Sequence, residues 1–261
     1  LSTIDLRAGI TYLIFILIFV IIGIKITSKY FEHKRIELIS VGLSWLFVSS
    51  MAWDNLYYFI HVLFFGEPSE LTFTFIIHTF RLGPPLAILF WMYSFNKLIS
   101  VKKKNQIIII SIYILNQIVA IIMYIFALIV DFSDILGAAE EALFIVIYYQ
   151  YITIFSIFFV ISLLITGILI VRDSLRSGDP KAKIKAKFLL SAFIISTVSS
   201  TILQISLVTS GQGGVYDQYH LAPSIAIIFV LTQFFVAISG VLFYFGFFLP
   251  EWLYKLSKKS D

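Results

Sequence analysis

The amino-acid sequence predicts an all-α polytopic membrane protein: a bundle of seven transmembrane helices, with its N-terminus outside and its C-terminus in the cytoplasm. Of the 261 residues, 60% are hydrophobic and 13% are charged, and the mean hydropathy is +0.98. A soluble domain of this size has too little polar side chain to cover so much apolar surface, so lipid must cover it. The length of the apolar stretches and the placement of the basic residues support the same fold class.

Seven apolar stretches are long enough to cross a bilayer, because a helix needs about 20 apolar residues to span the hydrocarbon core. They form one predicted bundle, residues 1–249, and a cytoplasmic juxtamembrane tail, residues 250–261, follows it. The predicted spans are 8–28, 36–64, 71–99, 106–130, 142–171, 186–209 and 221–249.

Apart from Arg7 near the N-terminus and Arg81 within a span, lysine and arginine lie in alternate connections. They lie in residues 25–35, 97–104 and 172–187 and in the tail, whereas the other connections carry acidic residues. Basic residues are retained on the cytoplasmic side, which predicts the orientation. Because the high Ile, Phe and Lys usage is compatible with an AT-rich archaeal or bacterial genome, we expect a prokaryotic cell membrane.

Two formal charges, Asp54 and Arg81, lie well inside the predicted spans. Each is about ten residues from the outer end of its span, or roughly 15 Å below it. An unpaired charge at such a depth costs about 3 kcal/mol on insertion scales. We therefore predict an Asp54–Arg81 ion pair, which is either a structural clasp between the second and third spans or part of a binding site.

Other polar residues are expected at a similar depth, where they would lack hydrogen-bond partners if they faced lipid. For the histidines, the plainer interpretation is a hydrogen-bonded core or interface residue. Taken together, the polar groups predict a polar core or ligand site in the outer half of the bundle. Its predicted members, besides the two charges, are Tyr57, His61, His78, Gln204 and Gln233.

Pro84 and Pro85 fall inside the predicted third span. A mid-helix proline removes a backbone donor and clashes one turn back, which bends the helix. We therefore expect a kink in this span, next to Arg81.

Several functional classes lack their motifs. Residues 221–249 contain no lysine, so no retinal Schiff base is expected, and no other cofactor is indicated. The segment YSFNKL stands where G-protein-coupled receptors carry Asp/Glu-Arg-Tyr. His61, His78 and His220 with Asp54 leave a dispersed zinc site as an alternative, as in seven-helix hydrolases that resemble ceramidases. Otherwise we expect neither enzymatic activity nor a nucleic-acid partner.

The basic loop RDSLRSGDPKAKIKAKFLL and the exit FGFFLPEWL, together with the N-out order and short loops, resemble the seven-helix N-terminal sensor regions of archaeal and bacterial histidine kinases. The resemblance implies a receptor-like sensor that binds a small molecule or lipid from the outer side. If the chain ends at residue 261, a signal is expected to leave through cytoplasmic loops or a cytoplasmic partner. The alternatives are a transporter or proton-conducting protein and a subunit of a membrane complex.

Overall fold

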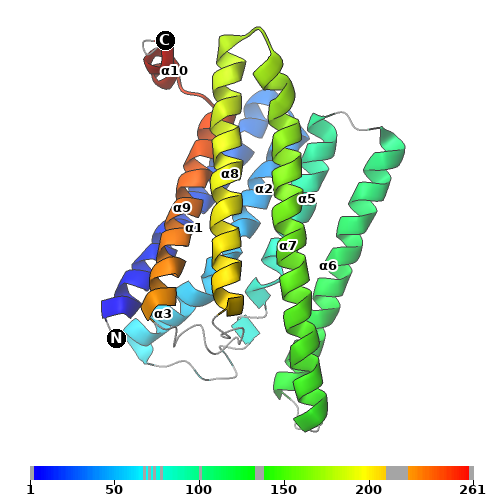
Figure 1. Cartoon of the computed structure of the whole chain (residues 1–261), viewed down its shortest axis with the longest axis vertical. Coiled ribbons are helices and arrows are strands. Elements are labelled where there is room, and N and C mark those ends of the chain that lie inside the picture. The colour runs from blue at the N-terminus through cyan, green and yellow to red at the C-terminus, as the bar shows by residue number, and fades with distance from the viewer. Residues whose placement is uncertain are drawn as a thin grey trace. The chain divides into compact units, whose positions relative to one another are not determined.

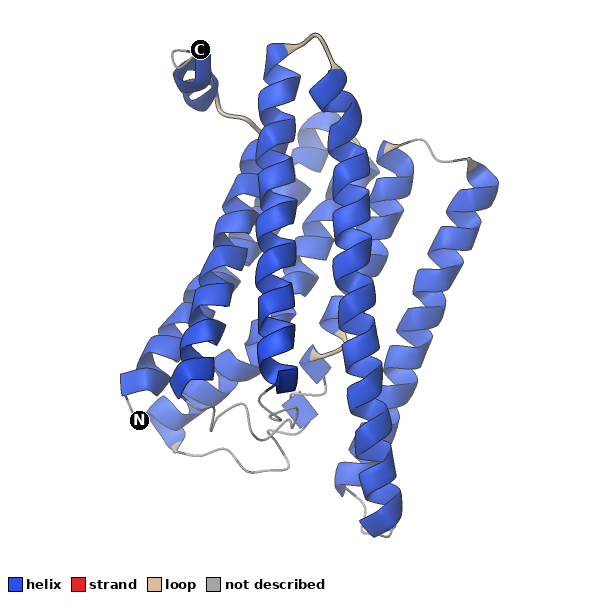
Figure 2. Cartoon of the chain, viewed as in Figure 1, coloured by secondary structure: helices blue, strands red, loops and turns tan. Residues whose placement is uncertain are grey.

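The computed structural model describes residues 3–66, 69, 72, 75–76, 79–99, 102–132, 138–209 and 223–258, and every regular element in them is a helix (Figure 2). Figure 1 labels the helices along the chain. They are α1 (Thr3–His33), α2 (Ile36–Ser49), the 3-10 helix η1 (Ser50–Ala52), α3 (Trp53–Phe65), α5 (Gly83–Leu98), α6 (Lys103–Phe132), α7 (Ala138–Arg176), α8 (Pro180–Thr209), α9 (Pro223–Phe247) and α10 (Glu251–Lys258).

Six helical segments among the described residues are long and apolar enough to cross a membrane, which confirms an all-helical integral membrane protein. They are Gly9–His33, Ile36–Phe65, Lys103–Ile129, Ile157–Arg176, Pro180–Ile202 and Val230–Phe247. The predicted third span, residues 71–99, is not among them. Its α5 has 16 residues, about 24 Å of helix, which is shorter than the ~30 Å hydrocarbon core. The third predicted span, and with it the total of seven, stays a prediction, as does the orientation.

The chain divides into two compact units, Leu1–Ile157 and Phe158–Asp261, and the division falls inside α7. In the first unit α1 packs on α2, and α2 packs on α5. The buried face of α1 has helical spacing, since it consists of Phe15, Phe19, Ile22 and Ile26. Glycine allows α1 and α2 to approach closely: a Cβ at Gly42 would lie 2.6 Å from the carbonyl oxygen of Gly23.

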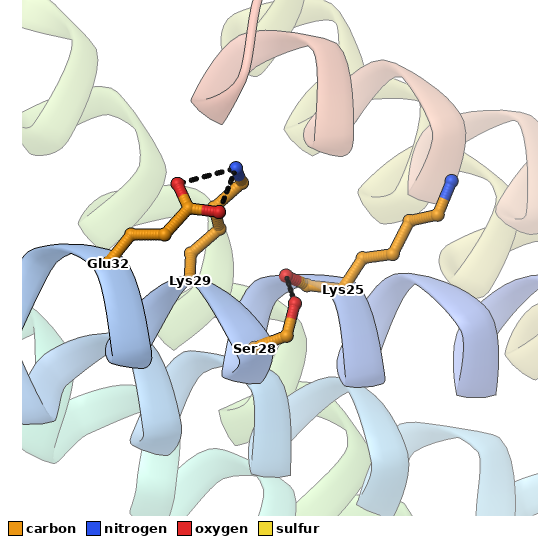
Figure 3. Close-up of polar contacts among 4 residues, drawn as sticks. All are labelled: Lys25, Ser28, Lys29 and Glu32. Carbon is orange, nitrogen blue, oxygen red and sulfur yellow. Dashed lines mark hydrogen bonds and ion pairs between the residues drawn. The ribbon is translucent and has the colours of Figure 1, made fainter.

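The end of α1 is set by local chemistry. Lys34 adopts a positive φ of 55° and its N–H donates to the carbonyl of Tyr30 at 2.7 Å, which is a left-handed helix termination. Figure 3 shows the preceding turns, where Lys29 Nζ contacts both carboxylate oxygens of Glu32 at 2.8 Å. Exposed pairs of this kind stabilise a fold little, but this pair offsets one positive charge in the basic connection.

Serine hydroxyls join α2 to α5. Ser40 Oγ donates to the carbonyl of Phe90 and Ser44 Oγ to the carbonyl of Ala87, both at 2.8 Å. Ser94 Oγ on α5 donates back to the carbonyl of Glu37 at 3.2 Å. Small polar side chains at helix interfaces let backbones approach and satisfy their own hydroxyls, so α2 and α5 are held at a defined register.

In the second unit α8 packs on α9. Asp179 caps the first turn of α8, because its carboxylate accepts the N–H of Lys181 at 2.9 Å, and Pro180 suits the first helical position. Phe193 of α8 meets Phe243 of α9 edge to face, with ring centroids 5.6 Å apart.

Large apolar side chains are exposed along α6, α7 and α9. Ile107 is 59% exposed, Ile154 67% and Phe234 56%. Such exposure would be costly in water, but lipid tails cover it in a membrane. The exposure therefore agrees with the spans that length and composition assign.

Candidate functional site

The membrane-spanning segment Ile36–Phe65 is interrupted between α2 and α3 by η1. Two serines lie at this break. Ser49 Oγ donates to the carbonyl of Leu46 at 2.6 Å, and Ser50 Oγ donates to the carbonyl of Phe47 at 2.7 Å. Serine hydroxyls that bond back to the preceding turn bend helices and satisfy carbonyls that leave the helical ladder. The sequence Ser49–Ser50 thus supplies a local reason for the break.

Asp54 lies in the first turn of α3, directly after the break, and is 6% exposed. Its Oδ1 accepts hydrogen bonds from the backbone N–H and the side-chain Nδ2 of Asn55, both at 2.8 Å. The N-cap residue of α3, Ala52, makes no side-chain cap hydrogen bond. A carboxylate at a helix N-terminus is stabilised by the N–H groups and dipole of the first turn. Asp54, in the first turn of α3, is placed to benefit from this stabilisation.

Arg81 lies in the turn that precedes α5, within electrostatic range of the Asp54 carboxyl group. The side chains next to both residues are also in contact, since the rings of Trp53 and Phe80 are 5.7 Å apart. The two formal charges that the sequence places deep in its spans are therefore neighbours. This neighbourhood places an opposite charge near the buried Asp54.

The start of α5 packs against the break in the preceding span. A Cβ on Gly83 would overlap the Ser50 side chain and would lie 3.1 Å from the carbonyl oxygen of Phe47. Only glycine allows this approach without a shift of η1. The N-terminus of α5 and the η1 break consequently form one junction, with Asp54 and Arg81 beside it.

Pro84 and Pro85 lie at the start of a helix. They lie in the first turn of α5, which begins at Gly83 after the turn at Arg81 and Leu82. Proline suits this place, because the first N–H groups of a helix have no partner inside it. The prolines therefore lie in the first turn of α5, after a turn at Arg81 and Leu82. The predicted kink at this place stays a prediction.

Tyr57 and His61 lie on α3 beyond Asp54. His61 Nδ1 is 2.7 Å from the carbonyl oxygen of Gly66, and the His61 ring lies 5.6 Å from Tyr57 and 5.5 Å from Phe65. These contacts tie the histidine to the C-terminal end of its own helix. His61 lies seven residues beyond Asp54 on α3, about 10 Å away. Its contacts therefore agree with a hydrogen-bonded core or interface histidine.

The remaining predicted site residues are not placed beside Asp54. His78 and the side chain of Gln204 lie outside the described residues. Gln233 is buried on α9, in the second unit. Within the described part of the chain, no group of three or more acidic or histidine residues could hold a metal ion. His78 and His220 fall outside that part, so the zinc alternative stays a prediction.

Three residues near the junction were not predicted. Asn55 supplies both hydrogen bonds to Asp54 Oδ1, Gly83 allows the close packing, and the charge of Asp54 acts on the hydroxyl of Tyr12 in α1. The pair Asp54–Asn55 was a usable signal, because both residue types favour helix starts. Tyr12 gave no such signal, since tyrosines near span ends are usually interfacial anchors.

The candidate site is thus a junction of two interrupted segments that carries the buried Asp54 and the partly exposed Arg81. No protein-family model, curated protein or solved structure matches this chain. A function must therefore follow from the charges and backbone geometry of the junction itself.

Proposed function

We propose that the chain is a receptor-like membrane module whose Asp54–Arg81 junction binds a small molecule with an anionic group. The observation that carries the proposal is the burial of Asp54 beside an interrupted span, with Arg81 next to the start of α5. Ionisable groups within spans are expensive and mark functional sites far more often than they mark simple packing.

The backbone at the junction supports an anionic ligand. Irregular backbone at membrane depth is tolerated where it is covered by protein or lines a cavity. Helix N-termini at such breaks direct their positive ends toward anionic groups. The start of α3 is already occupied by the Asp54 carboxylate, whereas the N-cap residue of α5, Leu82, makes no side-chain cap hydrogen bond. Arg81 adds a planar set of donors that matches carboxylate or phosphate.

A switching mechanism follows from the competition between two anions for Arg81. Without ligand, Asp54 is the anion that acts on Arg81. A ligand carboxylate or phosphate that binds Arg81 would weaken this attraction and favour a different arrangement of the junction. Binding shifts a conformational equilibrium only when the ligand favours one state, and this competition supplies the difference.

The movement has a route to the far end of α5. The contacts of Ser40, Ser44 and Ser94 couple α5 to α2 along their length. A shift at Gly83 would thus reach Leu98 and the basic connection 97–104, on the predicted cytoplasmic side. A cytoplasmic partner that reads this connection agrees with the resemblance to sensor regions of histidine kinases.

Transport is the second candidate function, and the interrupted segments favour it. Discontinuous helices with charges at their breaks form the substrate and ion sites of many secondary transporters. A transporter would move the bound anion across the membrane, whereas a receptor would bind it and retain it on one side. Uptake of the same compound into proteoliposomes separates the two.

The experiment is a thermal-shift screen of the purified chain in lipid nanodiscs against small carboxylates and phosphate esters. We expect at least one compound to raise the unfolding midpoint, because a ligand that binds the folded state stabilises it. The shift should vanish in Arg81→Gln and persist in Arg172→Gln, which removes an exposed charge elsewhere.

Two outcomes would contradict the proposal. One is a panel in which no compound shifts the midpoint of the folded wild-type chain. The other is a shift that survives in Arg81→Gln. In either case the Asp54–Arg81 contact would be a structural clasp, and Arg81→Gln would lower the unfolding midpoint without changing any ligand response.

A further inference from the structure

The short helix α10 lies against the end of the last membrane-spanning segment. Three residues separate it from α9, which ends at Phe247. The Trp252 ring meets the Phe245 ring edge to face, with centroids 6.3 Å apart. Phe245 belongs to the apolar segment Val230–Phe247. Trp252 is therefore held at the level of the last turns of the span, which is the membrane–water interface.

A second contact fixes α10 from another side. Lys181 Nζ, in the first turn of α8, lies over the Tyr254 ring at 5.8 Å from its centroid. Close by, Lys185 Nζ donates to the carbonyl of Phe247 at 3.1 Å, at the end of α9. A cation–π contact uses the face of the ring and leaves the ammonium hydrogens available for other acceptors.

One exposed face of α10 carries an apolar side chain beside a basic one. Trp252 is 57% exposed, and Lys255, three residues later on the same face, is also exposed. A tryptophan in this position favours the interface, and a lysine beside it extends its ammonium group to the headgroups. Such a face is expected on a helix that lies along a membrane surface.

The balance of charge favours an anionic surface. Lys181, Lys185 and Lys255 outnumber Asp179 and Glu251 here. Asp179 is also engaged in capping α8 through the N–H groups of Lys181 and Ala182. The N-terminus of α8 is consequently already satisfied. Any anion at this end would be recognised by lysine ammonium groups and not by the helix dipole.

We propose that Trp252, Lys255 and Lys181 form a docking surface for the anionic phospholipid headgroups of the adjoining leaflet. Trp252 is the apolar anchor, and the two lysines contact lipid phosphate. The occupant follows from continuity, because α9 crosses the membrane and the Trp252–Phe245 contact keeps α10 at its surface. The positive-inside pattern makes this the predicted cytoplasmic leaflet, whose anionic lipids attract such residues.

The test uses the absence of cysteine from the chain. A spin label on Ser257→Cys, near the end of α10, reports the mobility of this helix in nanodiscs. We expect the immobilised fraction to rise when phosphatidylcholine is partly replaced by phosphatidylglycerol and to fall again in high salt, which screens surface charge.

The deciding variant is Lys181→Gln/Lys255→Gln. Each lysine near an anionic surface contributes about fivefold in affinity. The rise in the ratio of immobilised to mobile label on adding phosphatidylglycerol should therefore fall about fivefold for each lysine removed. The matched control is Lys183→Gln/Lys187→Gln. It also removes two exposed charges from this end, but these lie on a different face of α8 from Lys181, so it should leave the label largely immobilised.

Three results would overturn the proposal. The label may have equal mobility with and without phosphatidylglycerol, or the two double variants may behave alike. Alternatively, inorganic phosphate added to phosphatidylcholine nanodiscs may immobilise the label as well as phosphatidylglycerol does, which would identify a free-phosphate site. A Lys181→Arg/Lys255→Arg variant keeps both charges and should retain the lipid effect.

Discussion

Gly83, at the first position of α5, packs directly against Ser50 in the η1 break of the preceding span. A Cβ on Gly83 would overlap the Ser50 hydroxyl, which itself donates to the carbonyl of Phe47 at 2.7 Å. The contact joins a helix start to a helix break, and Asp54 and Arg81 lie nearby in the sequence of the two segments. The geometry of the candidate site therefore depends on the absence of a side chain at residue 83.

Gly83→Ala should destabilise the folded chain by about 1–3 kcal/mol, because an added methyl group in a packed interface forces backbone or rotamer shifts. Thermal unfolding in detergent, followed by circular dichroism, measures the effect. Gly178→Ala is the matched control, since a Cβ at Gly178 meets nothing within 4 Å, and it should leave the midpoint nearly unchanged.

Ser50→Gly in the Gly83→Ala background should restore part of the lost stability, because it removes the Cβ and Oγ atoms that the new methyl group overlaps. The Phe47 carbonyl remains near, so full recovery is not expected. A double variant that is no more stable than Gly83→Ala would show that the new methyl group does not clash with the Ser50 side chain.

Ser44→Ala should weaken the contact between α2 and α5 by about 0.5–1 kcal/mol, the usual worth of one such interhelical hydrogen bond. Ser44 is buried and donates to the carbonyl of Ala87 at 2.8 Å. Ser191→Ala on the exposed surface of α8 should have no measurable effect. Equal unfolding midpoints for these two variants would show that the Ser44 hydrogen bond does not stabilise the contact between α2 and α5.

Cysteine labelling tests the number of spans. Ser69→Cys and Lys102→Cys flank the predicted third span, and both positions are exposed. If residues 71–99 cross the membrane, an impermeant maleimide on intact cells should label residue 69 and should label residue 102 only after permeabilisation. Labelling of both from the same side would leave six spans, because residues 71–99 would then not cross.

Ser177→Cys is the reference for this experiment. Two of the described spans, Lys103–Ile129 and Ile157–Arg176, separate it from Lys102. The two positions should therefore label from the same side of the membrane, whichever way residues 71–99 run. If only residue 69 is labelled on intact cells, and residues 102 and 177 are labelled only after permeabilisation, the predicted orientation is confirmed.

The candidate site was predictable in part. Asp54 and Arg81 stood out because formal charges are costly at membrane depth, and counting residues from the span ends gave them similar depths. The role of His61 was less predictable, since its contact with the carbonyl of Gly66 depends on how the chain turns after α3. The prolines were ambiguous, because Pro84 and Pro85 fit the first turn of a helix as well as they fit a kink.

The sequence by itself determined that the chain enters a membrane as helices. Long apolar segments leave no other way to satisfy backbone groups in lipid, and this constraint is local to each segment. Only the tertiary structure decided that the second span is interrupted at Ser50 and that α5 begins against it at Gly83. The reason is physical: a helix break is chosen by the fit between neighbouring helices, and a Ser–Ser pair or a Pro–Pro pair alone is compatible with an unbroken span, a kink or a new start.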